Sequence, residues 1–192
     1  MRAEGSQTLC PLFFTDNISS PSMGYGTDRG ERAAAYRVLG QFFLSPPDDE
    51  ALEAIRQDFS LGSRESLDKI AGEFNDLFSY PRGRLVPLES VFAPSSGGMT
   101  GDVVTIYAGA DLVIDDAYDV APDHISVEFL FMSYLIENGK TEMEQKFLEQ
   151  HLMNWVPYYC GEIIKQAKTL FYREIAEIVK DFLISEYDLY ER

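Results

Sequence analysis

The architecture of this chain follows from one segment, Ala121-Pro-Asp-His-Ile-Ser-Val-Glu-Phe-Leu-Phe-Met-Ser-Tyr-Leu135. Pro122 suits the entry to a helix, because a proline there loses no hydrogen bond and its φ is already helical. Asp123 is predicted to cap the helix or to lie at the positive end of its dipole. His124, one of only two histidines, stands at the start of the helix. Apolar side chains cover nearly the whole circumference, which predicts a central, buried helix; they are Ile125, Val127, Phe129, Leu130, Phe131, Met132, Leu135 and Ile136.

Amphipathic helices are predicted on both sides of that segment. They are expected at residues 28–44 (N-cap Asp28), 47–59, 63–78 (N-cap Ser63) and 102–114 (N-cap Asp102), from a capping box at Thr141 and Glu144, after Pro157, and up to about residue 183. Residues 86–92 are too short for a helix of their own, and no segment alternates with a period of two. We therefore predict an all-α fold, a single globular bundle of about seven to eight helices.

The N-terminal residues 1–27 differ in composition from the rest of the chain. They are rich in Ser, Gly, Thr and Pro and show no hydrophobic periodicity. We expect a flexible or loosely docked tail at 1–27 and an all-helical domain at 28–192. The N-terminus does not fit a signal peptide, because its apolar run is short, contains Pro11 and is followed by Asp16.

The charge balance restricts the class of partner. The 192 residues include 32 acidic and 16 basic side chains, a net charge of −16. This argues against nucleic acid or an anionic membrane, because phosphate binding needs clustered Lys and Arg. Residues 85–139 contain no Lys or Arg but nine acids, which form either a solvated acidic face or a surface complementary to a cationic segment. The two cysteines form no metal-ligand spacing and no disulfide framework, and no apolar run is long enough to span a bilayer, so a cytoplasmic location is expected.

The sequence offers little material for catalysis. It lacks a Gly-x-Ser-x-Gly nucleophile elbow and a phosphate-binding glycine loop. One alternative is a metal-dependent hydrolase, in which His124 and Glu128 lie one helical turn apart and His151 approaches from the next helix. Two histidines in the whole chain are few ligands for a catalytic metal site. A structural role is the better explanation for both: His124 as a neighbour of the cap, and His151 as a partly buried side chain beside Trp155.

Several motifs together resemble one known family. Pro122-Asp-His-Ile-Ser-Val-Glu-Phe-Leu-Phe-Met132 is similar to the Pro-Asp-His…Glu-Leu-x-Phe-Met signature of the TorD/DmsD/NarJ redox-enzyme maturation chaperones. Glu73-Phe-Asn-Asp-Leu-Phe78, Pro87-Leu-Glu-Ser-Val-Phe92 and Phe147-Leu-Glu-Gln-His-Leu-Met-Asn-Trp155 resemble further segments of that family, in the same order. The resemblance covers about residues 29–185. Phe129 stands where the family commonly has Leu, and the loop after Phe92 is unusually rich in glycine.

The resemblance implies a TorD-like, non-enzymatic, cytoplasmic chaperone. Such a protein binds the N-terminal leader, often a twin-arginine signal, of a molybdopterin oxidoreductase of the DMSO/TMAO or nitrate reductase type. It supports cofactor insertion and delays export. The partner would be the molybdoenzyme catalytic subunit, without nucleic acid or membrane insertion, and the chaperone would be a monomer or weak homodimer. It would have no cofactor of its own, because the client carries the molybdopterin, although weak guanine-nucleotide binding is suspected in relatives.

The residues that match the client-binding region of the family are Leu77, Phe78, Pro87, Glu89, Ser90, Pro122, Asp123 and His124. Physical chemistry favours the same region. A leader of this kind joins arginines to an apolar stretch, and residues 85–139 supply carboxylates next to Leu77 and Phe78. Carboxylate–arginine contacts fix register, while apolar side chains supply contact area. We therefore predict a peptide-binding surface at this place.

Overall fold

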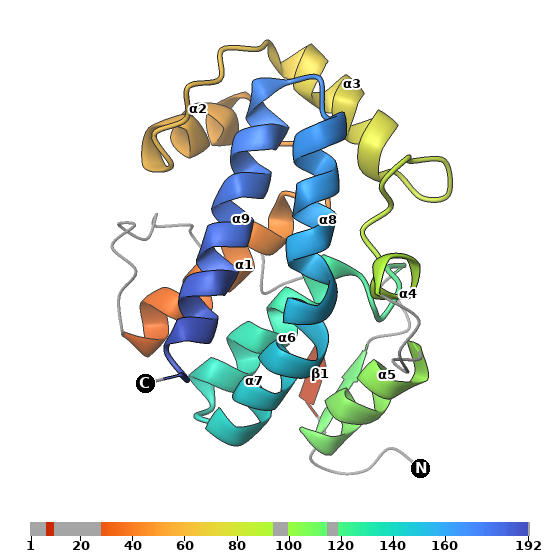
Figure 1. Ribbon diagram of the computed structural model, residues 1–192, viewed down its shortest axis with the longest axis vertical. Coiled ribbons are helices and arrows are strands. Elements are labelled where there is room, and N and C mark those ends of the chain that lie inside the picture. The colour runs from red at the N-terminus through yellow and green to blue at the C-terminus, as the bar shows by residue number, and fades with distance from the viewer. Residues whose placement is uncertain (1–6, 10–27, 94–99, 115–118, 192) are drawn as a thin grey trace.

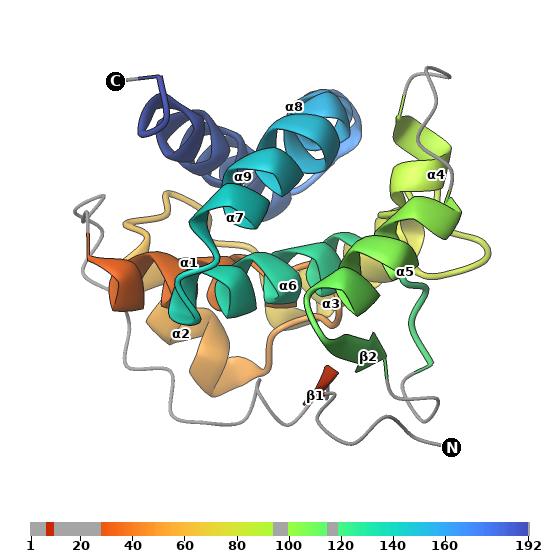
Figure 2. The ribbon, with the colours of Figure 1, turned by 90° about the horizontal axis from the view of Figure 1, so that it is seen from below.

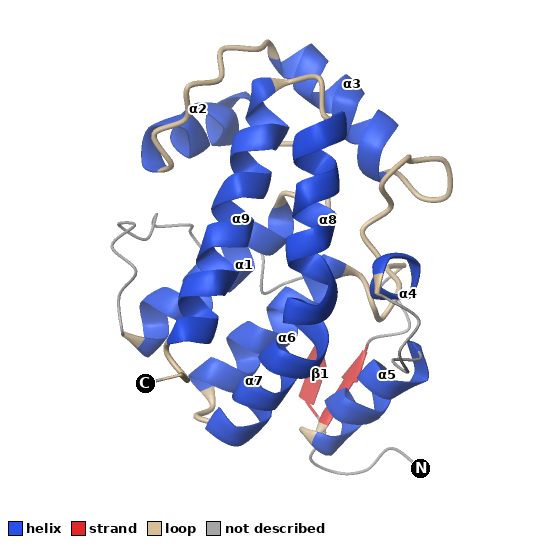
Figure 3. Ribbon diagram, in the orientation of Figure 1, coloured by secondary structure: helices blue, strands red, loops and turns tan. Residues whose placement is uncertain are grey.

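A computed structural model describes residues 7–9, 28–93, 100–114 and 119–191 (Figure 1). The elements are β1 (Gln7–Leu9), α1 (Arg29–Gln41), α2 (Asp49–Asp58), α3 (Leu67–Phe78), α4 (Glu89–Phe92), α5 (Thr100–Gly109), β2 (Leu112–Ile114), α6 (Ile125–Glu137), α7 (Thr141–Phe147), a π-helical turn η2 (Leu148–Leu152), α8 (Met153–Gln166) and α9 (Leu170–Asp188). Helices dominate (Figure 3), so the predicted all-α class is confirmed. Because α7, η2 and α8 follow one another without a break, these segments make eight helices within the described residues.

The helices form two packed layers. The hairpin of α8 and α9 lies over the pair α1 and α6, and Figure 2 shows the two layers from the side, with α8 and α9 above. Helices α2 and α3 lie at one end of the molecule, and α5 with the two strands lies at the other end. A single hydrophobic core extends from Ala33 to Leu183 and receives side chains from both layers. This is the ordinary solution for amphipathic helices, each of which has one apolar face to bury.

The central position predicted for the helix after Pro122 is confirmed. Almost every side chain of α6 is buried, including the polar Ser126 and Glu128. Helix α1 comes close to it because Gly40 has no side chain, and a Cβ there would lie 3.3 Å from the Cβ of Phe129. The hydroxyl of Ser126 donates to the carbonyl of Gly40 at 2.7 Å. The closest helix pair thus combines apolar packing with a satisfied buried hydroxyl.

The helix starts are only partly as predicted. Asp28 caps α1, accepting from the N–H groups of Gly30 and Glu31, as expected. The cap of α3 is Ser66, not Ser63, and its side chain makes no capping bond. The cap of α7 is Lys140, so the predicted capping box is wrong, and Glu144 is instead buried against Arg32. A sequence pattern that offers a local partner is overridden when a stronger partner comes from a distant segment.

Two further predictions fail near the sheet and in α8. The helix predicted for 102–114 begins at Thr100, ahead of its expected cap Asp102, and ends at Gly109. After a turn with Asp111 at φ 64°, β2 pairs in parallel with β1, Gln7 facing Leu112. Strands of three residues are too short to show alternation. Pro157, predicted to separate two helices, lies inside α8, just after the π-helical turn. Prolines and single π-helical turns both occur at irregular points of an otherwise continuous helix.

Short helix α4 also differs from the expectation for residues 86–92, since Glu89–Phe92 forms one helical turn. The predicted tail is described only at residues 7–9, so its boundary at residue 27 stays a prediction. Within the described residues, no helix has both the length and the apolarity needed to cross a membrane.

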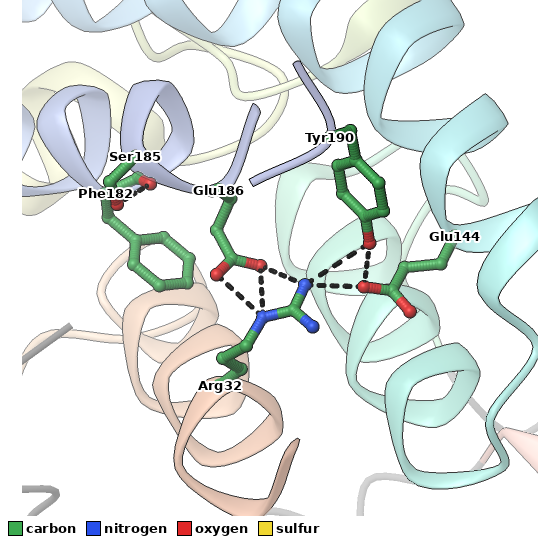
Figure 4. Close-up of polar contacts among 6 residues, drawn as sticks. All are labelled: Arg32, Glu144, Phe182, Ser185, Glu186 and Tyr190. Atoms are coloured by element: carbon green, nitrogen blue, oxygen red, sulfur yellow. Dashed lines mark hydrogen bonds and ion pairs between the residues drawn. The ribbon is translucent and has the colours of Figure 1, made fainter. Parts of the chain in front are cut away.

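A charged network joins three helices away from the sheet (Figure 4). Arg32 of α1 binds Glu186 of α9 through two nitrogens, at 2.9 and 2.7 Å, and binds Glu144 of α7 at 2.5 Å. Tyr190 donates to the same carboxylate of Glu144. Burial alone would lower the pKa of Arg32, but the hydrogen bonds and charge of Glu186, with Tyr190 and Glu144, raise it above its ordinary value. The guanidinium therefore stays charged and holds α1, α7 and α9 together.

Candidate peptide-binding site

A cavity of about 570 Å³ opens between the ends of α1 and α3 and two loops. Its lining residues are Phe43, Leu44, Phe74, Phe78, Ser79, Tyr80, Val86, Leu88, Asp119, Val120, Ala121 and His124. Most of them are apolar, and none is Lys or Arg. The volume lies in the range of sites that hold a small ligand or several side chains of a peptide.

Backbone hydrogen bonds fix the two loops beside the cavity. The N–H of Leu85 donates to the carbonyl of Leu77 at 2.7 Å, and the hydroxyl of Tyr159 donates to the carbonyl of Leu85 at 2.8 Å. Leu88 and His124 then form an antiparallel bridge, flanked by bonds from Ile125 N to Pro87 O at 3.0 Å and from Glu89 N to Asp123 O at 2.9 Å. The loop before α4 and the loop before α6 are thus joined into one rigid wall.

Aromatic rings form the floor of the cavity. Phe78 contacts Phe43 edge-on with ring centroids 5.6 Å apart, and it contacts Phe74 at 5.5 Å and Tyr172 at 5.2 Å. These interlocked rings are almost fully buried. Tyr80, by contrast, is 79% exposed at the rim. A large exposed aromatic beside an apolar hollow is typical of a contact surface.

The structure brings together only part of the predicted client-binding set. Phe78 and His124 line the cavity. Leu77 is fully buried in the core, and Pro87 is buried in the wall, so neither side chain lines the cavity. Ser90 is exposed on α4 but does not line the cavity, and Pro122 is partly buried, its carbonyl accepting from the hydroxyl of Tyr107 at 2.9 Å. These four residues support the site without lining it.

Two predicted acids, Glu89 and Asp123, are structural. Asp123 is only 2% exposed, and its carboxylate accepts from the N–H of Ser90 at 3.0 Å. It therefore satisfies an N–H in the first turn of α4, whose N-cap is Leu88. The prediction that it caps the helix that follows it is wrong, because His124 is the cap of α6. Glu89 is buried against Nδ1 of His151, at 3.0 and 3.2 Å, and fastens α4 to η2.

A third acid of the base-free stretch, Glu128, is fully buried in α6. It accepts from the indole N–H of Trp155 at 3.0 Å, while its other carboxyl oxygen has no hydrogen-bond partner among the described residues. Burial, together with the nearby charge of Glu89, raises the pKa of Glu128 well above its ordinary value. Burial therefore favours the neutral form of this carboxyl.

The predicted acidic surface is consequently smaller than the sequence suggested. Glu89, Asp123 and Glu128 are inside the protein, and Glu137 is paired with Arg37 of α1. The prediction that residues 85–139 present uncompensated carboxylates is therefore wrong for these four. Asp119 remains an exposed acid on the cavity.

His124 is part of the wall and is uncharged. Its Nδ1 accepts from the N–H of Ser126 at 3.2 Å, which places the ring proton on Nε2. Burial lowers the pKa of His124 to about 4, although the charge of Asp123 acts in the opposite direction. The cavity therefore contains a neutral imidazole at neutral pH.

The alternative of a metal site made by His124, Glu128 and His151 is contradicted. Each of these side chains has its own partner: the N–H of Ser126, the indole of Trp155 and the carboxylate of Glu89. No group of three or more His, Cys, Asp or Glu suited to a metal ion occurs in the described part of the chain.

Comparison with known proteins identifies the family. A family model described as "Nitrate reductase delta subunit" matches residues 44–161. The chain belongs to this family. The resemblance to the TorD/DmsD/NarJ group is thereby confirmed. The matched region contains α2 to α7, η2, most of α8 and every lining residue of the cavity except Phe43.

Two relatives carry the name "Chaperone protein TorD". The protein from Vibrio atlanticus is 28% identical over 140 residues, which are 62% of this chain and 64% of the relative. The protein from Photobacterium profundum is 24% identical over 143 residues, 65% of this chain and 66% of the relative. The chain thus spans slightly less than two thirds of the length of either relative.

A solved structure has the same fold. It is the crystal structure of an Archaeoglobus fulgidus protein suggested to act in redox enzyme maturation. The TM-score is 0.55 at 21% identity, covering 82% of this chain and 94% of the other.

Sequence reasoning missed several lining residues, among them Leu44, Tyr80 and Val120. Their signal in the sequence was weak, since each lies just beyond a helix end or in a loop with no periodicity. Tertiary contacts bring their segments together: Phe43 packs on Phe78, and Leu88 pairs with His124.

Proposed function

We propose that this protein is a maturation chaperone that binds the N-terminal leader of a molybdopterin oxidoreductase in the cavity beside His124. Binding would hold the client until its molybdenum cofactor is inserted, and would delay export where the leader is a twin-arginine signal. The chaperone works in the cytoplasm as a monomer or weak homodimer, without catalysis and without a cofactor of its own. Family membership and the names of the relatives support this proposal. Guanine-nucleotide binding stays a prediction.

The observation that carries the proposal is the chemistry of the cavity. Its wall is rigid, its floor is aromatic, and its lining has no basic residue that would repel a basic peptide. Apolar side chains of a leader would fill the hollow in a helix-in-groove contact, which derives its affinity from buried apolar area. In this proposal Glu89 and Asp123 support the wall of the cavity from inside the protein.

Substitution of Tyr80 tests the proposal. The probe is a synthetic, fluorescently labelled peptide with two consecutive arginines ahead of an apolar segment. Tyr80→Ala should weaken binding by about five- to tenfold, as expected for an aromatic contact at an interface. The matched control is Tyr158→Ala, because Tyr158 is also strongly exposed, at 60%, but lies on α8 outside the cavity.

Both variants should unfold at the same denaturant concentration as the parent, since neither residue is buried. Equal affinities of the two variants for the peptide would contradict a binding site at this cavity.

A further inference from the structure

The cavity contains one formal charge, on Asp119. The other lining residues are apolar, except for Ser79, Tyr80 and the neutral His124. Asp119 lies in the loop that precedes α6, and its side chain is exposed. Within the described part of the chain it makes no hydrogen bond or ion pair, so its carboxylate is available to a ligand.

The neighbouring acids cannot take this role. Asp123 is 2% exposed and Glu89 is 6% exposed, and both carboxylates are already bonded inside the protein. Glu128 is fully buried beneath them. None of these three acids lines the cavity.

We propose that Asp119 is the specificity-determining residue of the cavity, and that it selects peptides with a positively charged side chain adjacent to the apolar residues that fill the hollow. This inference rests on the proposed function and assigns its electrostatic part to one residue. Charge complementarity carries it: a single accessible carboxylate borders a hollow whose lining contains no basic side chain. Arg suits the partner position better than Lys, because its planar guanidinium can bind a carboxylate through two hydrogen bonds.

Partial exposure limits the strength of this contact. An exposed ion pair contributes little, and a charge-assisted hydrogen bond beside an apolar surface contributes more. We therefore expect a three- to twentyfold effect, roughly, which shrinks as salt is added because the carboxylate is only partly shielded from water. Apolar contacts would supply most of the affinity, and Asp119 would supply discrimination between peptides.

The experiment compares two variants on two peptides. The variants are Asp119→Asn and the matched control Asp111→Asn, which removes the same charge from an exposed position outside the cavity. Asn suits the positive φ of Asp111, so the control should not disturb the backbone. The peptides are the arginine-pair probe and the same peptide with both arginines replaced by glutamine, and fluorescence anisotropy gives the affinities at low and at physiological salt.

The expected result is specific to one variant and one peptide. Asp119→Asn should weaken binding of the arginine peptide about three- to twentyfold at low salt and leave the glutamine peptide unchanged. Asp111→Asn should change the affinity for either peptide only by the small effect of losing one surface charge. If the two variants behave alike while Tyr80→Ala still weakens binding, the role of Asp119 is refuted and the cavity stands. If the parent binds neither peptide, the proposed function is refuted and this inference with it.

Discussion

Two polar clusters lie inside this protein, and they differ in whether a guanidinium accompanies the buried carboxyl groups. The first surrounds Arg32, where one guanidinium lies between two carboxylates from α7 and α9. The second lies behind the cavity, where Glu89 meets His151 and Glu128 meets the indole of Trp155. Both clusters connect helices that are distant in sequence, but only the first contains a permanent positive charge.

The difference shows how a buried carboxylate is stabilised with and without a cation. In the Arg32 cluster one cation lies between the two carboxylates at every ordinary pH, because a guanidinium does not lose its proton. In the cluster behind the cavity, burial and the charge of Glu89 raise the pKa of Glu128, which favours the protonated carboxyl. The first cluster therefore keeps its cation at every ordinary pH, whereas the second contains an acid, Glu128, whose raised pKa makes its contribution to stability depend on pH.

Removal of the cation should give the largest effect. Arg32→Met leaves the carboxylates of Glu144 and Glu186 buried without compensation, and should reduce the free energy of unfolding by about 3–5 kcal/mol. Urea denaturation at neutral pH measures this change in the free energy of unfolding. The control is Arg37→Met, whose partner Glu137 is 42% exposed and whose loss should cost at most about 1 kcal/mol. Similar losses in the two variants would mean that the Arg32 network is no stronger than a surface ion pair.

A smaller effect, with a clear pH signature, is expected for Glu128→Gln. Because the folded pKa of Glu128 is raised from its ordinary 4.5, its stabilising contribution is complete below that pH and is lost as pH rises towards the folded pKa. Gln mimics the neutral acid at all pH values. The variant should therefore gain stability relative to the parent as the pH increases above about 4.5.

Denaturation of both proteins at several pH values between 4 and 8, roughly, would reveal this trend, which follows from linkage. A difference between variant and parent that does not change over this window would show that Glu128 is not held neutral by burial.

The helical framework was predictable from sequence because local signals and tertiary packing agree. The apolar circumference of α6 placed it at the centre, and Asp28 marked the start of α1. Predictions failed where a distant partner competes with a local one. Glu144 looked like half of a capping box, but it binds Arg32, which is 112 residues away in the chain.

The site was harder to predict for the same reason. Asp123 and Glu89 are acids in the expected region. The sequence does not reveal that their carboxylates are already hydrogen-bonded, that of Asp123 to the N–H of Ser90 and that of Glu89 to the ring of His151. Phe78 and His124 line the cavity, whereas Leu77, one residue before Phe78, points into the core. Adjacent helical residues face different directions, so a motif that spans both cannot by itself separate contact from support.

Hydrogen–deuterium exchange with and without the arginine-pair peptide tests the binding site most directly. The account predicts slower exchange in residues 79–88 and 119–124, on the rim and wall of the cavity, and unchanged exchange around Arg32, Glu144 and Glu186. Protection confined to α7 and the end of α9, or protection around Val91 and Tyr158 on the exposed faces of α4 and α8, would contradict it.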